Sequence, residues 1–277
     1  MNISLEIVIV LYQYSLDESI TFKTLNKQLG KTTIDYELVL YNNDVNQKIE
    51  AAGCLIVNSE ENKKLEGAYN FALERALETG KSWILLLDQD TEIPDNYFNE
   101  LEKLFSDNYS PDLVAVVPKL ISEGEIISPV QVTHLMRFER GINSNGYNNK
   151  RINALNSLSL LNVEFIKSIG GFSKDFPFDL HDHWCYNKIY KNKKKVYILD
   201  ITTEHSSSFN NFEENVSVSR YKEFLSTEDR FIRSEIGMPV YFFYKIKLLL
   251  RSIKQLINYK NKEFSLVTLA AVFKWSQ

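Results

Sequence analysis

The chain has 277 residues, of which 44% are hydrophobic and 25% are charged, so it can bury a sizeable core and is not expected to be disordered. Its formal net charge of -4 argues against a nucleic-acid-binding protein, because such proteins carry clustered positive charge. The two cysteines, Cys54 and Cys185, lack metal-site spacing and indicate a reducing compartment. The start does not resemble a signal peptide and no apolar run is long enough to span a membrane, so we expect a cytoplasmic protein.

Strand and helix patterns alternate through the first half of the chain. The strand patterns are short apolar runs rich in β-branched residues, as in strands buried on both faces of a sheet. This alternation predicts an α/β fold with a mostly parallel sheet flanked by helices. The predicted strands cover residues 5–12, 36–41, 55–58, 83–87 and 113–117, and the predicted helices cover residues 19–29, 66–79 and 96–105.

The second half of the chain is less regular. We expect a catalytic domain over residues 1–238, with a donor-binding half to residue 120 and an acceptor half after it, followed by a helical tail over residues 239–277. In the acceptor half, residues 122–152 look like polar loops, strands are predicted at 153–161 and 196–201, and helices are predicted at 164–169 and in the segment 178–191.

Polar side chains follow several of the predicted strands at the point where each strand ends. The carboxyl ends of parallel strands meet at one edge of a sheet, and ligands bind there. We therefore expect one site built from Tyr12 and Gln13, residues 42–44, Asn58 and residues 88–90.

Asp88 and Asp90 follow the strongest of the predicted strands. Two carboxylates one residue apart can approach one hard cation, with a diphosphate completing its coordination. Oxygen ligands favour Mg²⁺ or Mn²⁺, which would neutralise charge on a departing diphosphate. His205, after the strand predicted at 196–201, is a further candidate ligand. The alternative is a loop of solvated aspartates, one of which caps the next helix.

A second acidic segment leads into the last helix predicted before residue 200. Asp182 could act as the general base that deprotonates an acceptor hydroxyl, with Asp179 as a neighbouring carboxylate. The alternative is that Asp182 only caps the helix. His181 and His183 could serve the same site, although residues two apart do not share a helix face.

The start of the helix predicted at 66–79 combines Asn62, Gly67 and Asn70. A helix N-terminus with small residues can accept the close approach of a ligand. The chain has neither a P-loop sequence nor the glycine fingerprint of a dinucleotide site.

Together these segments resemble the family 2 glycosyltransferases, and within them the bacterial rhamnosyltransferase-like group. The most specific match is LLLDQDT at residues 85–91, which is similar to the L-L-D-Q-D-[ST] motif of that group. The chain departs from the family at Tyr41, Lys64 and His183, where aspartate, glycine and an acidic residue are common. Further resemblances lie at residues 8–13, 40–44, 62–70, 169–172, 178–185 and 220–221, and at His205.

The resemblance implies a GT-A fold and an inverting glycosyltransferase that uses a nucleotide sugar and a divalent metal. It favours deoxythymidine-diphosphate rhamnose as donor, with uridine-diphosphate sugars next, and a saccharide or lipid-linked saccharide acceptor in bacterial surface polysaccharide synthesis. It places the catalytic base at Asp182 and the metal at Asp88, Asp90 and His205. We expect donor contacts from Tyr12, Asn42, Asn62, Gly67, Asn70, Asp88 and Gln89, and acceptor-side contacts from Asp179, His181, His183 and Trp184.

Two other classes of protein remain open. A nucleotidyltransferase also uses a metal and acidic residues, but it usually has a glycine-rich, basic N-terminal loop, which residues 11–30 lack. A catalytically degenerate module that binds saccharide or acts as a scaffold is compatible with the departures at Tyr41, Lys64 and His183.

The predicted tail, residues 239–277, combines apolar helical patterns with seven basic residues and the single acidic residue Glu263. A basic amphipathic helix can lie on the inner face of the cell membrane, with lysine stems flanking an apolar face. The alternative is that these helices pack on the sheet or form a homodimer interface.

Overall fold

The computed structural model describes residues 3–133, 138–205 and 216–274. The chain divides into two compact units. The first unit comprises Met1–Gln131 and Phe138–Ser206, and the second comprises Val132–Arg137 and Ser207–Gln277.

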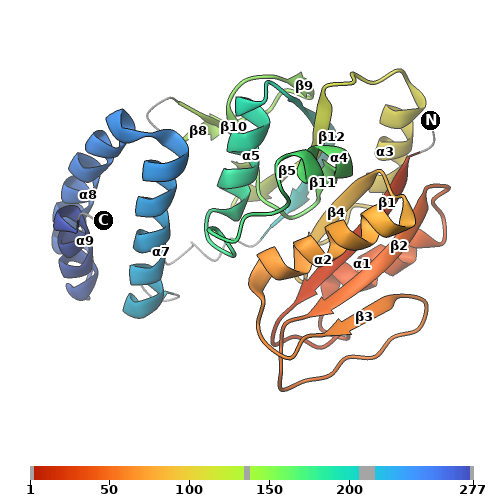
Figure 1. The fold of residues 1–277 in the computed structure, drawn as a ribbon, viewed down its shortest axis with the longest axis horizontal. Helices are drawn as coiled ribbons and strands as arrows, with labels where there is room; N and C mark the ends of the chain where they lie inside the picture. Colours follow the sequence, from red (N-terminus) through yellow and green to blue (C-terminus); the bar gives the residue numbers. More distant parts are fainter. Residues whose placement is uncertain (1–2, 134–137, 206–215, 275–277) are drawn as a thin grey trace. The chain divides into compact units, whose positions relative to one another are not determined.

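The first unit is built on a large mixed sheet with helices on its faces (Figure 1). Its strand order is β3-β2-β1-β4-β11-β5-β12-β9, and β6 pairs with β5. The strands are β1 (Ser4–Leu11), β2 (Asp35–Asn42), β3 (Leu55–Asn58), β4 (Trp83–Asp88), β5 (Leu113–Ser122), β6 (Glu125–Ser128), β9 (Gly146–Asn148), β11 (Ser159–Asn162) and β12 (Lys195–Glu204). A smaller sheet orders β10 (Ile152–Asn153), β7 (Val130–Val132) and β8 (Phe138–Gly141). The helices of this unit are α1 (Ile20–Leu29), α2 (Lys64–Thr79), α3 (Tyr97–Ser106), α4 (Val163–Ser168) and α5 (His181–Lys191).

The apolar pattern of β1 explains its central place in the sheet. Leu5, Ile7 and Ile9 are fully buried in one core cluster together with Leu25 of α1 and Leu101 of α3. Since successive side chains of a strand point to opposite faces, these residues share one face of the sheet. The small residues of α2 allow that helix to pack closely; those fully buried are Ala68, Ala72 and Ala76.

The expected mainly parallel core of the α/β sheet is confirmed, although β6, β9 and β11 pair antiparallel with their neighbours. β1 pairs in parallel with β2 and β4, and β5 pairs in parallel with β12. β11 lies antiparallel between β4 and β5. The single strand predicted at 153–161 was wrong, because β10 and β11 are separate strands in different sheets.

The second half of the chain contains elements that the sequence patterns did not indicate. The expectation of loops over residues 122–152 was wrong, because this region contains β6, β7 and β9. These strands have only three or four residues, too few to establish an alternating pattern.

The second unit contains α7 (Val218–Phe231), the short π-helix η1 (Ile232–Ile236), α8 (Met238–Asn258) and α9 (Glu263–Phe273). The expected helices after residue 238 are therefore confirmed. The division between the units lies near residue 206, so α7 and η1 group with the tail helices, and a functional boundary at residue 238 stays a prediction. Across the described ranges, no helix is both long enough and apolar enough to cross a bilayer.

Glu6 places a buried carboxyl group in β1 of the first unit. Its side chain is fully buried, and neither carboxylate oxygen has a hydrogen-bond partner among the described residues. The pKa of Glu6 is raised to about 7, chiefly by burial and then by the charge of Glu37, while Arg75 and Lys81 oppose the shift. A raised pKa means that ionisation of Glu6 costs the folded state free energy.

We predict that Glu6→Gln reduces the loss of stability on going from pH 5 to pH 8. The folded pKa of about 7 lies above the ordinary value of 4.5, so the folded state holds the proton more tightly. Stability therefore falls as pH rises between these values, by up to about 3 kcal/mol, and stays low above them. Urea unfolding of both proteins at each pH measures the difference. Parallel pH dependences of the two free energies of unfolding would contradict the assignment.

Candidate active site

Hydrogen bonds join the loops after β1 and β4 at the carboxyl edge of the sheet. The backbone N–H of Tyr12 donates to Gln89 Oε1 at 2.8 Å, and Gln89 Nε2 donates to the Tyr12 carbonyl oxygen at 3.3 Å. Ser19, the N-cap of α1, donates its hydroxyl to the Gln89 carbonyl oxygen at 2.7 Å. Gln89 thus fixes the loop, whereas the Tyr12 ring is 45% exposed and can meet a ligand.

Asp88 and Asp90 form the acidic centre of this edge. Asp88 ends β4 and is half-buried, while Asp90 is exposed two residues later. Burial raises the pKa of Asp88 above its ordinary value; the Ser157 hydroxyl, which donates to Asp88 Oδ2, opposes this shift. The negative charges of Asp90 and Asp182 raise the same pKa, and His205 lowers it. The site thus gathers negative charge that a cation would stabilise.

His205 reaches the same loop from the end of β12. Its backbone N–H donates to the Ile121 carbonyl oxygen at 2.9 Å, and its Nδ1 lies 3.3 Å from Thr91 Oγ1. Thr21 Oγ1 holds Thr91 in turn, since it accepts from the Thr91 backbone N–H and donates to the Thr91 carbonyl oxygen, both at 2.8 Å. His205 therefore lies beside the acidic loop, as its sequence position predicted.

A hard cation fits the donor atoms of this site only with help from a substrate. Asp88 and Asp90 offer carboxylate oxygens, the ligands that Mg²⁺ and Mn²⁺ prefer. Within residues 3–133, 138–205 and 216–274, no three His, Cys, Asp or Glu side chains gather closely enough to hold a metal ion. The expected set of Asp88, Asp90 and His205 is therefore not preassembled among the described residues, and substrate oxygens or water would complete the coordination.

Asp182 lies in the first turn of α5 in a different electrostatic environment. Its Oδ1 lies 2.8 Å from both the backbone nitrogen and Nδ1 of His183, and Asn153 Nδ2 donates to Oδ2 at 3.2 Å. Burial acts to raise the pKa of Asp182, but the charge and hydrogen bonds of His183 and the Asn153 contact hold it below its ordinary value. Asp182 is therefore ionised at neutral pH. The N-cap of α5 is Leu180, so Asp182 is not the helix cap that the alternative required.

Two of the expected acceptor-side residues lie in the core. His181 is fully buried, 5.3 Å from the Phe172 ring and 5.2 Å from the Tyr69 ring. Burial lowers the pKa of His181 to about 4, so its ring is neutral. Trp184 is only 4% exposed. The structure therefore does not support acceptor contacts by His181 or Trp184, whereas Asp179 and His183 are partly exposed.

Two of the asparagines expected to contact the donor hold loops in place. Asn42 is buried, its Nδ2 donates to Asn58 Oδ1 at 3.0 Å, and its Oδ1 accepts from the Asp44 backbone N–H at 2.9 Å. Asn62 Oδ1 accepts from the Lys64 backbone N–H at 2.9 Å, at the start of α2. Polar groups at the ends of β2 and β3 do meet, as expected, but they are largely satisfied by one another.

Asn70 ties α2 to the segment that leads into α5. Its Nδ2 donates to the Phe172 carbonyl oxygen at 3.0 Å, and its Oδ1 accepts from the Phe172 backbone N–H at 2.9 Å. Gly171 has a φ of +83°, and a Cβ there would lie 2.7 Å from Asn70 Oδ1. The Glu66 backbone N–H donates to the Pro177 carbonyl oxygen at 3.0 Å. Asn70 therefore positions the loop before Asp182 and does not present its amide to a donor here.

The first turn of α2 explains two features of the sequence. Lys64, where the family commonly has glycine, adopts a φ of 58°, the left-handed conformation that glycine adopts most easily. A Cβ on Gly67 would collide with Cβ of Lys63, so glycine is needed for packing. The Tyr41 ring, where the family has aspartate, is buried with its centroid 5.7 Å from that of Phe71.

The sequence analysis missed Ser157, Asn153 and Tyr69. Ser157 and Asn153 bind carboxylates 69 and 29 residues away, and no local pattern indicates such pairing. The Tyr69 hydroxyl is buried without a hydrogen-bond partner in the described part of the chain. Burial raises the pKa of Tyr69, and the charges of Asp88 and Asp182 add to the shift, so this hydroxyl lies near both carboxylates.

We predict that His183→Ala raises the pKa of Asp182. The substitution removes the ring charge and the side-chain hydrogen bond that lower this pKa, while burial, which raises it, remains. Carboxyl-carbon NMR titration of Asp182 measures the shift. His183→Asn is the matched control, since its amide can replace the Nδ1 hydrogen bond and should recover part of the effect. An unchanged pKa in His183→Ala would show that His183 does not set the charge of Asp182.

Comparisons with known proteins agree with this fold. The mannosyltransferase PcManGT from Pyrobaculum calidifontis, solved in complex with GDP-Man and Mn2+, has 12% identity and a TM-score of 0.54, over 98% of this chain and 86% of that one. TarS from S. aureus has 13% identity and a TM-score of 0.52, over 94% of this chain and 46% of that one. At these identities the likeness shows the fold alone, a GT-A fold.

A search of curated protein sequences found no match to the chain. The sequence profile described as glycosyl transferase family 2 matches residues 7–169, which is more than half of the chain and includes most of β1, all of β4 and Asp88 to Asp90. The protein therefore belongs to glycosyl transferase family 2.

Proposed function

We propose that this chain is an inverting glycosyltransferase that moves a sugar from a nucleoside-diphosphate donor to a saccharide hydroxyl. The observation that carries the proposal is the pairing of two unlike carboxylates. Asp88 and Asp182 are 94 residues apart in sequence yet close enough that the charge of Asp182 raises the pKa of Asp88. Burial raises the pKa of Asp88, whereas the contacts with His183 lower the pKa of Asp182. Carboxylates with different environments can perform different tasks in one reaction.

Asp88 and Asp90 would hold Mg²⁺ or Mn²⁺, with His205 as a further candidate ligand. The ion would neutralise the negative charge of the leaving diphosphate. Gln89 lies between the two aspartates in sequence, and its hydrogen bonds to the backbone of Tyr12 hold the loop that carries both carboxylates. The PcManGT complex supports this assignment to the extent that a protein of similar fold was solved with Mn2+ and a nucleotide sugar.

Asp182 would act as the general base. Its Oδ1 is engaged by His183, whereas its Oδ2 accepts only a long hydrogen bond from Asn153 among the interactions observed. Oδ2 would therefore take the proton of the acceptor hydroxyl as that oxygen attacks the anomeric carbon. Inversion needs one base and a stabilised leaving group, and the alignment of both substrates supplies much of the rate.

For the donor, we favour deoxythymidine-diphosphate rhamnose, with uridine-diphosphate sugars next, because residues 85–91 resemble the rhamnosyltransferase motif. The acceptor would be a saccharide or lipid-linked saccharide used in surface polysaccharide synthesis at the cytoplasmic side of the membrane. The test is a panel of nucleotide sugars, scored for nucleoside-diphosphate release with and without Mn²⁺. If the chain binds saccharide but transfers no sugar from any donor, it is a degenerate binding module. The buried Tyr41, where the family commonly has aspartate, is compatible with that outcome.

We predict that Asp90→Ala lowers turnover more than tenfold and leaves the fold intact. Asp90 is exposed, so its removal costs little packing, but it takes away half of the carboxylate pair. Loss of charge stabilisation at the diphosphate is worth several kcal/mol. Asp95→Ala is the matched control, since Asp95 is an exposed aspartate on the same connection and lies outside the proposed site. Turnover above about a tenth of wild type, or roughly 1.4 kcal/mol, would contradict the metal assignment.

We predict that Asp182→Asn abolishes most transfer and preserves donor binding. Removing a general base costs on the order of 10²–10⁴ in rate. Steady-state assays measure transfer, and calorimetry with the nucleoside diphosphate measures donor affinity. Asp179→Asn is the comparison, because Asp179 is the neighbouring carboxylate on the loop before α5. If only Asp179→Asn lost activity, Asp179 would be the base.

A further inference from the structure

The inner face of α8 is polar. Its buried residues are Tyr241, Tyr244, Lys245, Leu248, Ser252 and Gln255, and of these only Leu248 has no polar side-chain atom. A helix of a water-soluble protein normally turns an apolar stripe to its neighbours and polar residues to solvent. The buried face of α8 therefore follows a different rule from the core of the first unit, although the second unit also buries apolar side chains such as Leu225, Phe231 and Phe264.

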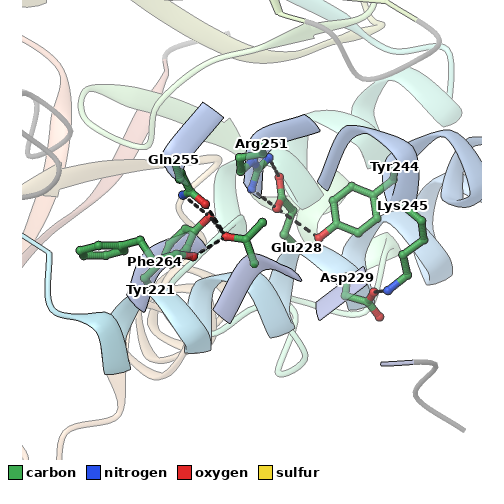
Figure 2. Close-up of polar contacts among 9 residues, drawn as sticks. Tyr221, Glu228, Asp229, Tyr244, Lys245, Arg251, Gln255 and Phe264 are labelled. Carbon is green, nitrogen blue, oxygen red and sulfur yellow. Dashed lines mark hydrogen bonds and ion pairs between the residues drawn. The ribbon is translucent and has the colours of Figure 1, made fainter. Parts of the chain in front are cut away.

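Hydrogen bonds between side chains hold the three long helices of this unit together (Figure 2). Gln255 Nε2 donates to the Tyr221 hydroxyl at 2.9 Å, and Thr268 Oγ1 donates to Gln255 Oε1 at 2.6 Å. The Tyr221 and Thr268 hydroxyl oxygens lie 2.9 Å apart, which closes a ring across α7, α8 and α9. Ser252 and Ser265 exchange hydrogen bonds with each other's carbonyl oxygens at 2.9 and 2.8 Å.

Two ion pairs complete this interior. Lys245 Nζ lies 2.6 Å from Asp229 Oδ1, and the two side chains are 8% and 11% exposed. Arg251 binds Glu228 through both terminal nitrogens, at 2.8 and 2.9 Å, and the Tyr244 hydroxyl donates to the same carboxylate at 3.2 Å (Figure 2). Lys245 and Arg251, two of the seven basic residues counted in the tail, are therefore paired with carboxylates of α7.

The outer face of α8 and α9 is apolar. On α8 the exposed residues recur at helical spacing and form one broad face, and α8 contains no acidic residue. We name this surface the outer apolar face; its exposed side chains are Phe242, Phe243, Ile246, Leu249, Leu250, Ile253, Leu256 and Ile257 of α8 and Leu266, Leu269 and Phe273 of α9. An exposed apolar surface of this extent, with its polar partners turned inward, marks a surface for binding.

The charges around the outer apolar face are positive. Lys247 and Lys254 are exposed and lie seven residues apart, about two helical turns, so they fall on one side of α8. Lys260 and Lys262 follow in the exposed turn before α9, and Glu263 is the acidic residue of that helix. An apolar face bordered by lysines is the pattern of helices that lie in the headgroup region of a bilayer.

We infer that the outer apolar face binds the surface of an anionic lipid bilayer, with α8 and α9 lying in the plane of the interface. Charge complementarity selects this occupant over a second copy of the chain. A symmetric dimer through this face would bring the same lysines together, whereas anionic headgroups attract each of them. The polar interior fits the same conclusion, because hydrogen bonds can hold helices together while their apolar side chains contact lipid.

Cosedimentation of the full chain with lipid vesicles tests the inference. The probes are phosphatidylcholine vesicles and phosphatidylcholine vesicles in which about one lipid in three is phosphatidylglycerol. We expect the protein to sediment with the anionic vesicles at low salt and to be released as salt increases. Leu250→Ser with Ile257→Ser should lower the partition coefficient at least tenfold; both residues are exposed, at 61% and 72%, so the helices should persist by circular dichroism.

Matched controls separate this surface from general effects. Leu55→Ser with Val45→Ser removes exposed apolar side chains from the first unit and should leave vesicle binding unchanged. Lys254→Glu with Lys260→Glu should abolish the preference for anionic vesicles. Absence of wild-type binding at low salt, or equal binding by Leu250→Ser with Ile257→Ser, would overturn the inference. A wild-type dimer that this double variant converts to monomer, without vesicle binding, would overturn it in favour of self-association. Neither readout depends on sugar transfer.

Discussion

The parallel pairing of β1 with β4 is the constraint on which the proposed site depends. The register places Val10 opposite Asp88, so the ends of the two strands deliver Tyr12 and the acidic loop to the same edge. Both strands are buried on both faces, and their backbone groups must therefore be paired within the sheet. A slip of one residue would turn the apolar set of β1, including Ile7, away from its core. Burial of apolar side chains thus fixes the place of the carboxylates, although the carboxylates contribute nothing to that burial.

The carboxylates of Asp182 and Asp88 lie in different electrostatic environments. Contacts with His183 and Asn153 stabilise the ionised carboxylate of Asp182, which keeps its negative charge. Asp88 receives one hydroxyl, from Ser157, and lies near the charges of Asp90 and Asp182. Asp182 is therefore ready to accept a proton, whereas the negative charge around Asp88 remains to be balanced by a bound cation. The hydrogen bonds between Asn70 of α2 and Phe172 fix the segment that leads into α5 and Asp182.

The parts of the fold that could be predicted from the sequence are those with a strong local pattern. The runs at 5–12 and 83–87 had to be strands, and Asp88 had to emerge at the edge where such strands end. The antiparallel insertion of β11 and the contacts of Ser157 depend on segments that meet only after folding. The same limit applies to His181, whose buried ring packs against that of Tyr69, 112 residues away in sequence. Apolar spacing in α8 located an amphipathic helix, but it could not say which face turned inward.

The polar interior of the second unit also affects how that unit responds to temperature. Unfolding the first unit exposes a large apolar core, and apolar exposure raises the heat capacity. Unfolding the second unit releases hydroxyls, amides and charged groups such as Gln255, Lys245 and Arg251, and polar exposure lowers the heat capacity. Per residue, we therefore expect the helices of the second unit to have the smaller heat-capacity change and the flatter stability curve. If the two compact units unfold separately, a single melting temperature does not describe the chain.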